Sequence, residues 1–170
     1  MVLGKTGSSF TLVYKKETYP VEIPFIGQHN IYNTLACLGS GIGIGRDLRM
    51  SIKGISRGVC VPGRLEPVKN SAGYSVFVDY AHTDDALLHA LGTLRSLTKG
   101  KLILVFGCGG DRDSKKRPKM GKVAFEYADI SLITNDNPRS EDPQRIVRDI
   151  QKGMGKGSHI VEFDRKKAIE

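Results

Sequence analysis

The chain has 170 residues, of which 39% are hydrophobic and 26% are charged, and its formal net charge is +8. This length allows one domain or two small ones with an ordinary buried core. No apolar run approaches the roughly 20 residues of a membrane-spanning helix, and no secretory signal is visible, so we expect no membrane insertion. Three widely spaced cysteines (Cys37, Cys60 and Cys108) form neither a metal-ligand pattern nor a disulfide framework, which fits a reducing cytoplasm.

The positive charge is compatible with nucleic acid, with an anionic small substrate or with simple solubility. Basic residues are scattered along the chain, and the few aromatic residues do not alternate with them as a single-strand binding surface requires. We therefore expect no nucleic-acid partner, although a basic nucleic-acid-binding domain stays an alternative that the salt dependence of DNA affinity would test.

The N-terminal part predicts a β-hairpin, because residues 10–14 and 19–24 alternate apolar and polar side chains on either side of a short turn. From Gly27 the pattern becomes helical, and the glycines of residues 39–45 are expected to break the helix. A second amphipathic helix is expected over residues 47–58.

After residue 66 the rhythm of the sequence changes, and we place a domain boundary between residues 1–66 and 67–170. Four apolar strands are expected to begin at intervals of about 28 residues, near Tyr74, Leu102, Ile130 and His159. Helical stretches separate them. This spacing is typical of successive βαβ units, so it predicts an α/β domain with a mostly parallel sheet and right-handed crossovers.

Polar loops follow three of these strands, at residues 79–85, 107–113 and 135–139. Because parallel strands have their carboxyl ends at the same edge of a sheet, the three loops are expected to lie together. Open α/β sheets bind ligands at that edge. The sequence therefore predicts a small-molecule site there.

Two of the loops carry arginines beside carboxylates, in the strings Asp111-Arg112-Asp113 and Asp136-Asn137-Pro138-Arg139. Arginine forks grip carboxylates in a bidentate manner, and Asp and Asn oxygens accept hydrogen bonds from ammonium groups. This combination suits a zwitterionic ligand, and Pro138 favours a rigid turn that aims Arg139. A surface ion-pair cluster that fixes the two loops is the alternative.

Other candidate residues are less specific. Asp79, at a strand end, suits the diol of a ribose or the cap of the following helix equally well. His29 and His82 are more typical of packing or solvent positions than of catalysis. The histidines are too dispersed for a zinc motif, and no Ser-His-Asp or Cys-His arrangement is readable. The residues alone therefore predict a small-molecule site in an α/β domain, and no more.

Six segments, taken in order, resemble the motifs of the Mur ligase family, and within it those of the members that add diaminopimelate. They are residues 27–33 (GQHNIYN), 63–66 (GRLE), 79–83 (DYAHT), 106–113 (FGCGGDRD), 116–121 (KRPKMG) and 136–139 (DNPR). Any one segment is a weak signal, but six in the family's order are specific and extend over almost the whole chain. The resemblance implies an ATP-dependent amide ligase of peptidoglycan synthesis in the cytoplasm.

In that family, ATP phosphorylates the D-glutamyl carboxylate of a UDP-MurNAc-dipeptide. The amine of meso-diaminopimelate then attacks the acyl phosphate, and Mg2+ offsets the phosphate charge. The implied fold is the end of the central ATP-binding domain over residues 1–66, followed by an incomplete Rossmann-like C-terminal domain over residues 67–170. The second domain would supply the amino-acid substrate.

The resemblance also implies roles for individual residues. The ATP-binding set, near adenine and ribose, would be Asn30, Asn33, Arg64 and Asp79. The diaminopimelate-binding set would be Arg112, Asp136, Asn137 and Arg139. His29 and His82 lie within two of the motifs and are further candidates. An arginine at position 139 accompanies diaminopimelate rather than lysine, because diaminopimelate has a carboxylate where lysine has none.

The chain departs from the family pattern in that Asp84 replaces a proline, which removes no proposed ligand. The phosphate loop, a carbamylated lysine and the magnesium ligands are expected before Met1, and a Gly-Lys-Gly-His-Glu motif after Glu170. We therefore expect no catalytic residue or metal ligand within the chain, and no activity of the chain alone. A lysine-adding Mur ligase, a folylpolyglutamate synthetase and a non-catalytic small-ligand-binding module stay alternatives. The oligomeric state is not predicted.

Overall fold

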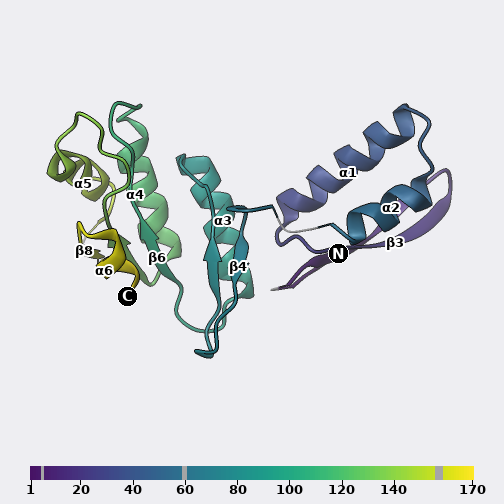
Figure 1. The fold of residues 1–170 in the computed structure, drawn as a ribbon, viewed down its shortest axis with the longest axis horizontal. Coiled ribbons are helices and arrows are strands. Elements are labelled where there is room, and N and C mark those ends of the chain that lie inside the picture. The colour runs from purple at the N-terminus through teal and green to yellow at the C-terminus, as the bar shows by residue number, and fades with distance from the viewer. Residues whose placement is uncertain (5, 59–60, 156–158) are drawn as a thin grey trace. The chain divides into compact units, whose positions relative to one another are not determined.

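The computed structural model describes four stretches of the chain: residues 1–4, 6–58, 61–155 and 159–170. Cys60 lies outside them. The chain forms two compact units, unit 1 (Met1–Tyr80) and unit 2 (Ala81–Glu170), each visible in Figure 1. Compactness divides the chain after residue 80, whereas the sequence pattern changes at residue 66, and the boundary inferred from that change stays a prediction.

Unit 1 contains a three-stranded antiparallel sheet. Strands β1 (Val2–Leu3), β2 (Ser8–Tyr14) and β3 (Glu17–Ile23) are neighbours in that order. Lys15 and Lys16, between β2 and β3, have φ values of 48° and 69°. Two consecutive positive φ angles are typical of the tight turns that match the twist of a hairpin. The predicted hairpin is therefore confirmed.

Two helices accompany this sheet, α1 (Gln28–Gly43) and α2 (Leu48–Ser56). Their apolar side chains join those of β2 and β3 in one cluster around the buried Val21, Ile23 and Ile31. Helix α2 confirms the second predicted helix. The predicted break within residues 39–45 is wrong for most of that stretch, because α1 continues to Gly43. A helical glycine costs only about 1 kcal/mol, which the buried face of α1 offsets. The chain leaves the helical path at Gly45, with φ at 77°.

Unit 1 ends in a small hairpin of β4 (Glu66–Val68) and β5 (Val76–Val78), which pair antiparallel. Within the described residues, β4 is the only partner of β5. The expectation that the strand near Tyr74 belongs to the parallel sheet is therefore wrong, and the loop from Asp79 does not follow a strand of that sheet. A short connection makes the local antiparallel pairing inexpensive in loop entropy.

Unit 2 confirms the predicted α/β architecture. Its parallel sheet has the order β6 (Ile103–Phe106), β7 (Ile130–Ile133) and β8 (His159–Val161), and α4 (Lys116–Tyr127) and α5 (Pro143–Gln151) lie in the two connections. Phe106 is in register with Ile133, so the segments that follow β6 and β7 begin side by side. This register positions the candidate site.

Helix α3 (Asp84–Leu97) precedes the sheet of unit 2 and packs against α4, and the short α6 (Arg165–Ile169) follows it. The buried core of unit 2 combines α3, α4, α5 and the sheet, and includes Leu91, Met120, Ile133 and Ile150. In the part of the chain that the structure describes, no helix has the length and apolar character needed to cross a membrane.

Candidate functional site

Two loops meet at the carboxyl ends of β6 and β7: the glycine loop, residues 107–113, and the arginine loop, residues 135–141. The Gly110 amide donates to the carbonyl of Asn137 at 2.8 Å, so the two backbones touch. A Cβ atom at Gly107 would collide with the carbonyl oxygen of Thr134, and one at Gly110 with that of Pro138. The glycines are therefore required by close backbone approach, and the predicted meeting of these two loops is confirmed.

Asp111 fixes the end of the glycine loop. Its backbone has a φ of 51°, which is uncommon for a residue with a side chain. Its carboxylate accepts hydrogen bonds from Ser140 Oγ at 2.8 Å and from the Ser140 amide at 3.2 Å. The Asp111 amide in turn donates to Glu141 Oε1 at 2.6 Å. Side chains of the arginine loop thus hold Asp111 in this conformation.

A buried arginine lies behind the two loops. The Arg117 guanidinium, from the first turn of α4, donates to both oxygens of Glu141 at 2.7 and 2.9 Å. It also donates to Asp149 Oδ2 at 3.2 Å and to the Gly109 carbonyl at 3.4 Å. No role for Arg117 or Glu141 was predicted from the sequence. A signal was present, since Arg117, Met120 and Ala124 share the buried stripe of α4.

The charges of this cluster shift the pKa values of its members. The hydrogen bond from Arg117, supported by the one from the Asp111 amide, lowers the pKa of Glu141 to about 2. The pKa of Asp149 is lowered too, chiefly by Lys152 and then by Arg117. The Glu141 hydrogen bond raises the pKa of Arg117, so the pair is ionised.

Three of the four residues in the diaminopimelate-binding set converge on Gly109. A Cβ atom built there would lie 2.9 Å from Arg139 Nη1, 3.6 Å from the Asn137 carbonyl and 4.0 Å from Asp136 Oδ2. Arg139 also has a positive φ, of 50°, and donates through Nη1 to the carbonyl of Gly110. The Nη1 atom of Arg139 therefore connects the two loops. This contact agrees in part with the alternative in which the arginines and carboxylates only fix the loops.

The remaining side chains of the set are available to a ligand. Asp136 and Asn137 are exposed, and among the described residues neither side chain makes a hydrogen bond. Arg112 is exposed as well, and its one hydrogen bond is a long contact of 3.5 Å to the carbonyl of Asp111. The arrangement thus presents carboxylate and amide acceptors beside Arg139, with Arg112 exposed on the adjoining glycine loop, which is the chemistry expected for a zwitterion.

The ATP-binding set falls into two groups within unit 1. Asn30 and Asn33 lie one turn apart at the start of α1. The Asn30 amide donates to the carbonyl of Ile26 at 2.8 Å, and the Asn33 amide donates to Asn30 Oδ1 at 3.3 Å. Asn30 is half-buried and Asn33 is exposed, so Asn30 orients its neighbour. His29, beside them, is half-buried.

The second group surrounds the base of the β4–β5 hairpin. Asp79 Oδ2 accepts from the amide of Leu65 at 2.8 Å, which stabilises the positive φ of 44° at Leu65. The Arg64 guanidinium lies over the ring of Tyr80, 5.6 Å from its centroid. Arg64 and Asp79 are thus brought to the same turn, and Asp79 has a structural role there rather than capping α3. In unit 2, the exposed His82 accepts at its carbonyl from Lys116 Nζ.

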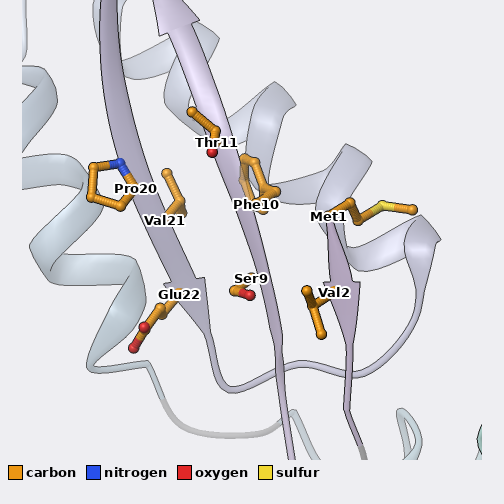
Figure 2. A pocket seen from close by; sticks show the side chains of 8 residues that line it. All are labelled: Met1, Val2, Ser9, Phe10, Thr11, Pro20, Val21 and Glu22. Atoms are coloured by element: carbon orange, nitrogen blue, oxygen red, sulfur yellow. The ribbon is translucent and has the colours of Figure 1, made fainter.

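A separate pocket of about 260 Å³ lies on the sheet of unit 1. Figure 2 shows the side chains that line it. Apart from Glu22, its lining side chains are uncharged: Met1, Val2, Ser9, Phe10, Thr11, Pro20 and Val21. It contains none of the residues singled out from the sequence.

Residues 63–170 match the family model described as "Mur ligase, glutamate ligase domain". The chain belongs to the Mur ligase family. It is 45% identical over 165 residues to the UDP-N-acetylmuramoyl-L-alanyl-D-glutamate–2,6-diaminopimelate ligase of Clostridium botulinum. That match covers 96% of this chain and 34% of the relative. The chain thus spans about a third of the length of the curated relatives it matches.

Solved structures agree with this membership. A UDP-N-acetylmuramoyl-L-alanyl-D-glutamate–2,6-diaminopimelate ligase matches with a TM-score of 0.64 and 36% identity, over 98% of this chain and 34% of its own. Mycobacterium tuberculosis folylpolyglutamate synthase complexed with ADP matches with a TM-score of 0.80 over 98% of this chain and 37% of its own. At 21% identity, the latter shows a shared fold alone.

Membership of the Mur ligase family raises the question of whether the described residues can bind a metal ion or a nucleotide. No group of three or more His, Cys, Asp or Glu side chains able to bind a metal ion occurs within residues 1–4, 6–58, 61–155 and 159–170. The exposed Arg64 and Asn33, by contrast, are hydrogen-bonding groups of the kind that a nucleotide needs.

Proposed function

We propose that this chain is part of a cytoplasmic, ATP-dependent amide ligase that adds meso-diaminopimelate to UDP-MurNAc-L-Ala-D-Glu in peptidoglycan synthesis. ATP would convert the D-glutamyl carboxylate to an acyl phosphate. Attack by the amine would form the amide and release phosphate. The observation that carries the proposal is the approach of the Arg139 and Asp136 side chains and of the Asn137 backbone carbonyl to Gly109, between the ends of two parallel strands. The relatives named as diaminopimelate ligases support it.

In this proposal, unit 2 binds the amino acid. Arg139 and Arg112 hold carboxylates of diaminopimelate, while Asp136 and Asn137 accept hydrogen bonds from an ammonium group. A ligand with two zwitterionic ends needs donors and acceptors at fixed spacing, which the rigid contact between the glycine and arginine loops supplies. Lysine lacks the second carboxylate and leaves one guanidinium without its partner.

Unit 1 contributes to nucleotide binding. Asn30 and Asn33 would contact adenine, and Arg64 and Asp79 the ribose. His29, in unit 1, and His82, in unit 2, are further candidate site residues. Magnesium would offset phosphate charge in the complete enzyme, but no ligand for it is assigned to this chain. Because the chain spans about a third of its relatives' length, we expect the 170 residues alone to show no turnover.

The decisive experiment measures ATP turnover by the full-length ligase that carries this chain, with UDP-MurNAc-L-Ala-D-Glu and either meso-diaminopimelate or lysine. We expect phosphate release that depends on diaminopimelate, with kcat/KM lower by at least about a hundredfold for lysine. Equal use of both amines would contradict the specificity. Turnover with tetrahydrofolate and glutamate instead would favour the folylpolyglutamate alternative.

Arg139→Ala tests the assignment of the loop. Removing the guanidinium should raise KM for diaminopimelate by at least about tenfold and leave KM for ATP within about twofold. Lys122→Ala serves as the control, because Lys122 is an exposed cation of unit 2 that pairs with Glu126 and lies outside both loops. An equal rise of both KM values in Arg139→Ala would show that the arginine loop does not bind the amine.

A further inference from the structure

Arg117, the arginine of the KRPKMG segment, is not stabilised by any feature of its own helix. Helix α4 begins without a side-chain cap, and its first turn contains no acidic residue. Basic residues in that turn, including Lys116 and Arg117, face the positive end of the helix dipole, which is unfavourable. Arg117 is nevertheless fully buried, at 0% exposure. Burying a charge is costly unless it is paired, so the contacts of Arg117 must account for its presence.

Those contacts connect three segments of unit 2. Arg117 binds Glu141 of the arginine loop through two parallel hydrogen bonds, the strong fork geometry of an arginine–carboxylate pair. It also reaches the carbonyl of Gly109 in the glycine loop and Asp149 in α5. Among the described residues, only the Nε atom of the guanidinium lacks a partner.

We infer that Arg117 is a positioning residue: by holding Glu141 and Gly109 it sets the spacing between the glycine and arginine loops, and so aims Arg139 and its neighbours at the amino acid. This inference rests on the proposed function for its ligand. Arg117 itself has no exposed surface and does not touch substrate. Its effect passes through Glu141, which also accepts from the Asp111 amide, and through Gly109, around which Asp136 and Arg139 gather.

The structure assigns Glu141 the role of the bridge. One of its oxygens, Oε1, accepts from both Arg117 and the Asp111 amide, at 2.7 and 2.6 Å. Without the guanidinium, this carboxylate would lose its fixed orientation, and with it the support for the strained backbone of Asp111. Glu141 is therefore not a ligand of the amine, in contrast to Asp136, whose side chain is free within the described part of the chain.

The test uses Arg117→Lys in the full-length ligase, because lysine keeps the charge and loses the planar fork. We expect KM for diaminopimelate to rise about tenfold or more, since a displacement of binding groups by 1 Å weakens a site strongly, while KM for ATP stays within about twofold. Glu141→Gln keeps the shape of the side chain and should give a smaller rise in the same KM. It also supplies the comparison should Arg117→Lys fail to fold.

The matched control is Arg95→Lys. Arg95 forms an ion pair with Asp129 in the same unit, and Asp129 accepts from the Leu102 amide, before β6 rather than after it. We expect Arg95→Lys to leave KM for diaminopimelate within about twofold. A similar rise in both variants would overturn the inference, because general loss of stability would then explain it. An unchanged KM in Arg117→Lys would overturn it as well.

Amide hydrogen exchange gives a readout that does not depend on the substrate. Arg117→Lys should speed exchange at Gly110 and Asp111, and Arg95→Lys at Leu102 instead, each by about tenfold, as expected for local opening. If the wild type shows no turnover with diaminopimelate, the proposed function fails, and these rates still decide whether Arg117 holds the loops. Unchanged exchange at Gly110 and Asp111 would overturn the positioning role even in an active ligase.

Discussion

Each end of strand β6 is held by an arginine–carboxylate pair whose carboxylate also accepts from a backbone amide, which we call a clamp. The exposed clamp is Arg95–Asp129 and the buried clamp is Arg117–Glu141. Before the strand, Arg95 donates to Asp129 at 2.7 Å, and the same carboxylate oxygen accepts from the Leu102 amide at 2.6 Å. After the strand, Glu141 is likewise shared between an arginine and a backbone amide. In both cases the carboxylate links an arginine side chain to the backbone of a neighbouring segment and so restricts the movement of that segment.

The clamps differ in burial. The side chain of Arg117 is 1% exposed, whereas that of Arg95 is 33% exposed. Exposed ion pairs contribute little because water already solvates both charges, while loss of one partner from a buried pair leaves a charge without compensation. The buried clamp stands at the end where Asp136 and Asn137 are exposed. Rigidity is thus concentrated where the proposed ligand needs fixed spacing.

The largest expected effect comes from Arg117→Met, which removes the buried charge and keeps a side chain of similar length. Glu141 and Asp149 lose their shared partner, and we expect the free energy of unfolding to fall by about 3 kcal/mol. Arg95→Met should lower the melting temperature by only about 2 °C. Urea and thermal unfolding of the 170-residue chain measure both. If both variants lowered the melting temperature by the same amount, the difference in burial would have no energetic consequence.

Glycines at the two ends provide the next comparison. In Gly110→Ala the new Cβ would collide with the carbonyl of Pro138, so the loops must separate, and we expect a loss of about 2 kcal/mol. A Cβ atom at Gly100 would meet no atom of another segment within 4 Å, so Gly100→Ala should be nearly neutral. Unfolding by urea again measures the effect. A neutral Gly110→Ala would contradict the close contact between the loops.

The sequence predicted the parts of unit 2 that depend on periodicity. Strands recurring at intervals of about 28 residues imply a parallel sheet, and the polar residues after β6 and β7 then have to meet at one edge. For this reason the spacing of the strands alone predicted that residues 107–113 and 135–139 would meet, whereas the grouping of Asp136, Asn137 and Arg139 as ligands of one amino acid came from the resemblance to the Mur ligase family. The same rule failed for β5, because a three-residue strand near another segment pairs locally, which spacing along the chain does not reveal.

The buried clamp was not predicted, for a physical reason. A charged residue in a helical pattern normally lies on the solvated face, and Arg117 is surrounded by other basic residues in the sequence. Its partners, Glu141 and Asp149, follow 24 and 32 residues later, and only the folded chain brings them together. The roles assigned to the ATP-binding and diaminopimelate-binding residues stay predictions.

Acid should weaken the two clamps to different degrees. The pKa of Glu141 is lowered from 4.5 to about 2, so its ionised form stabilises the folded state above about pH 4.5, and this contribution is lost as the pH falls towards 2. The pKa of Asp129 is also lowered, chiefly by the Leu102 amide, and the sign is the same. Because Asp129 is more exposed, Glu141→Gln should flatten the pH dependence of unfolding between pH 4.5 and 2 more than Asp129→Asn does. The reverse order would contradict the comparison.

Cys108 lies in the glycine loop and is buried. Burial raises the pKa of its thiol from 9.0 to about 11, so at pH 8 it carries about a hundredfold less thiolate than an ordinary cysteine. Cys37, exposed on α1, is the internal reference. Labelling with iodoacetamide, followed by peptide mapping, should therefore modify Cys37 first, with Cys108 slower by about a hundredfold or more.

The same labelling compares local opening at the two ends of β6 in variants that remain folded. Arg117→Lys should loosen the glycine loop, which contains Cys108, and speed labelling of Cys108 severalfold, whereas Arg95→Lys acts at the other end of β6 and should not. Both variants are compared at a temperature where circular dichroism shows them fully folded. Equal acceleration would mean that Cys108 reacts through global unfolding, and that the glycine loop has no separate opening for Arg117 to suppress.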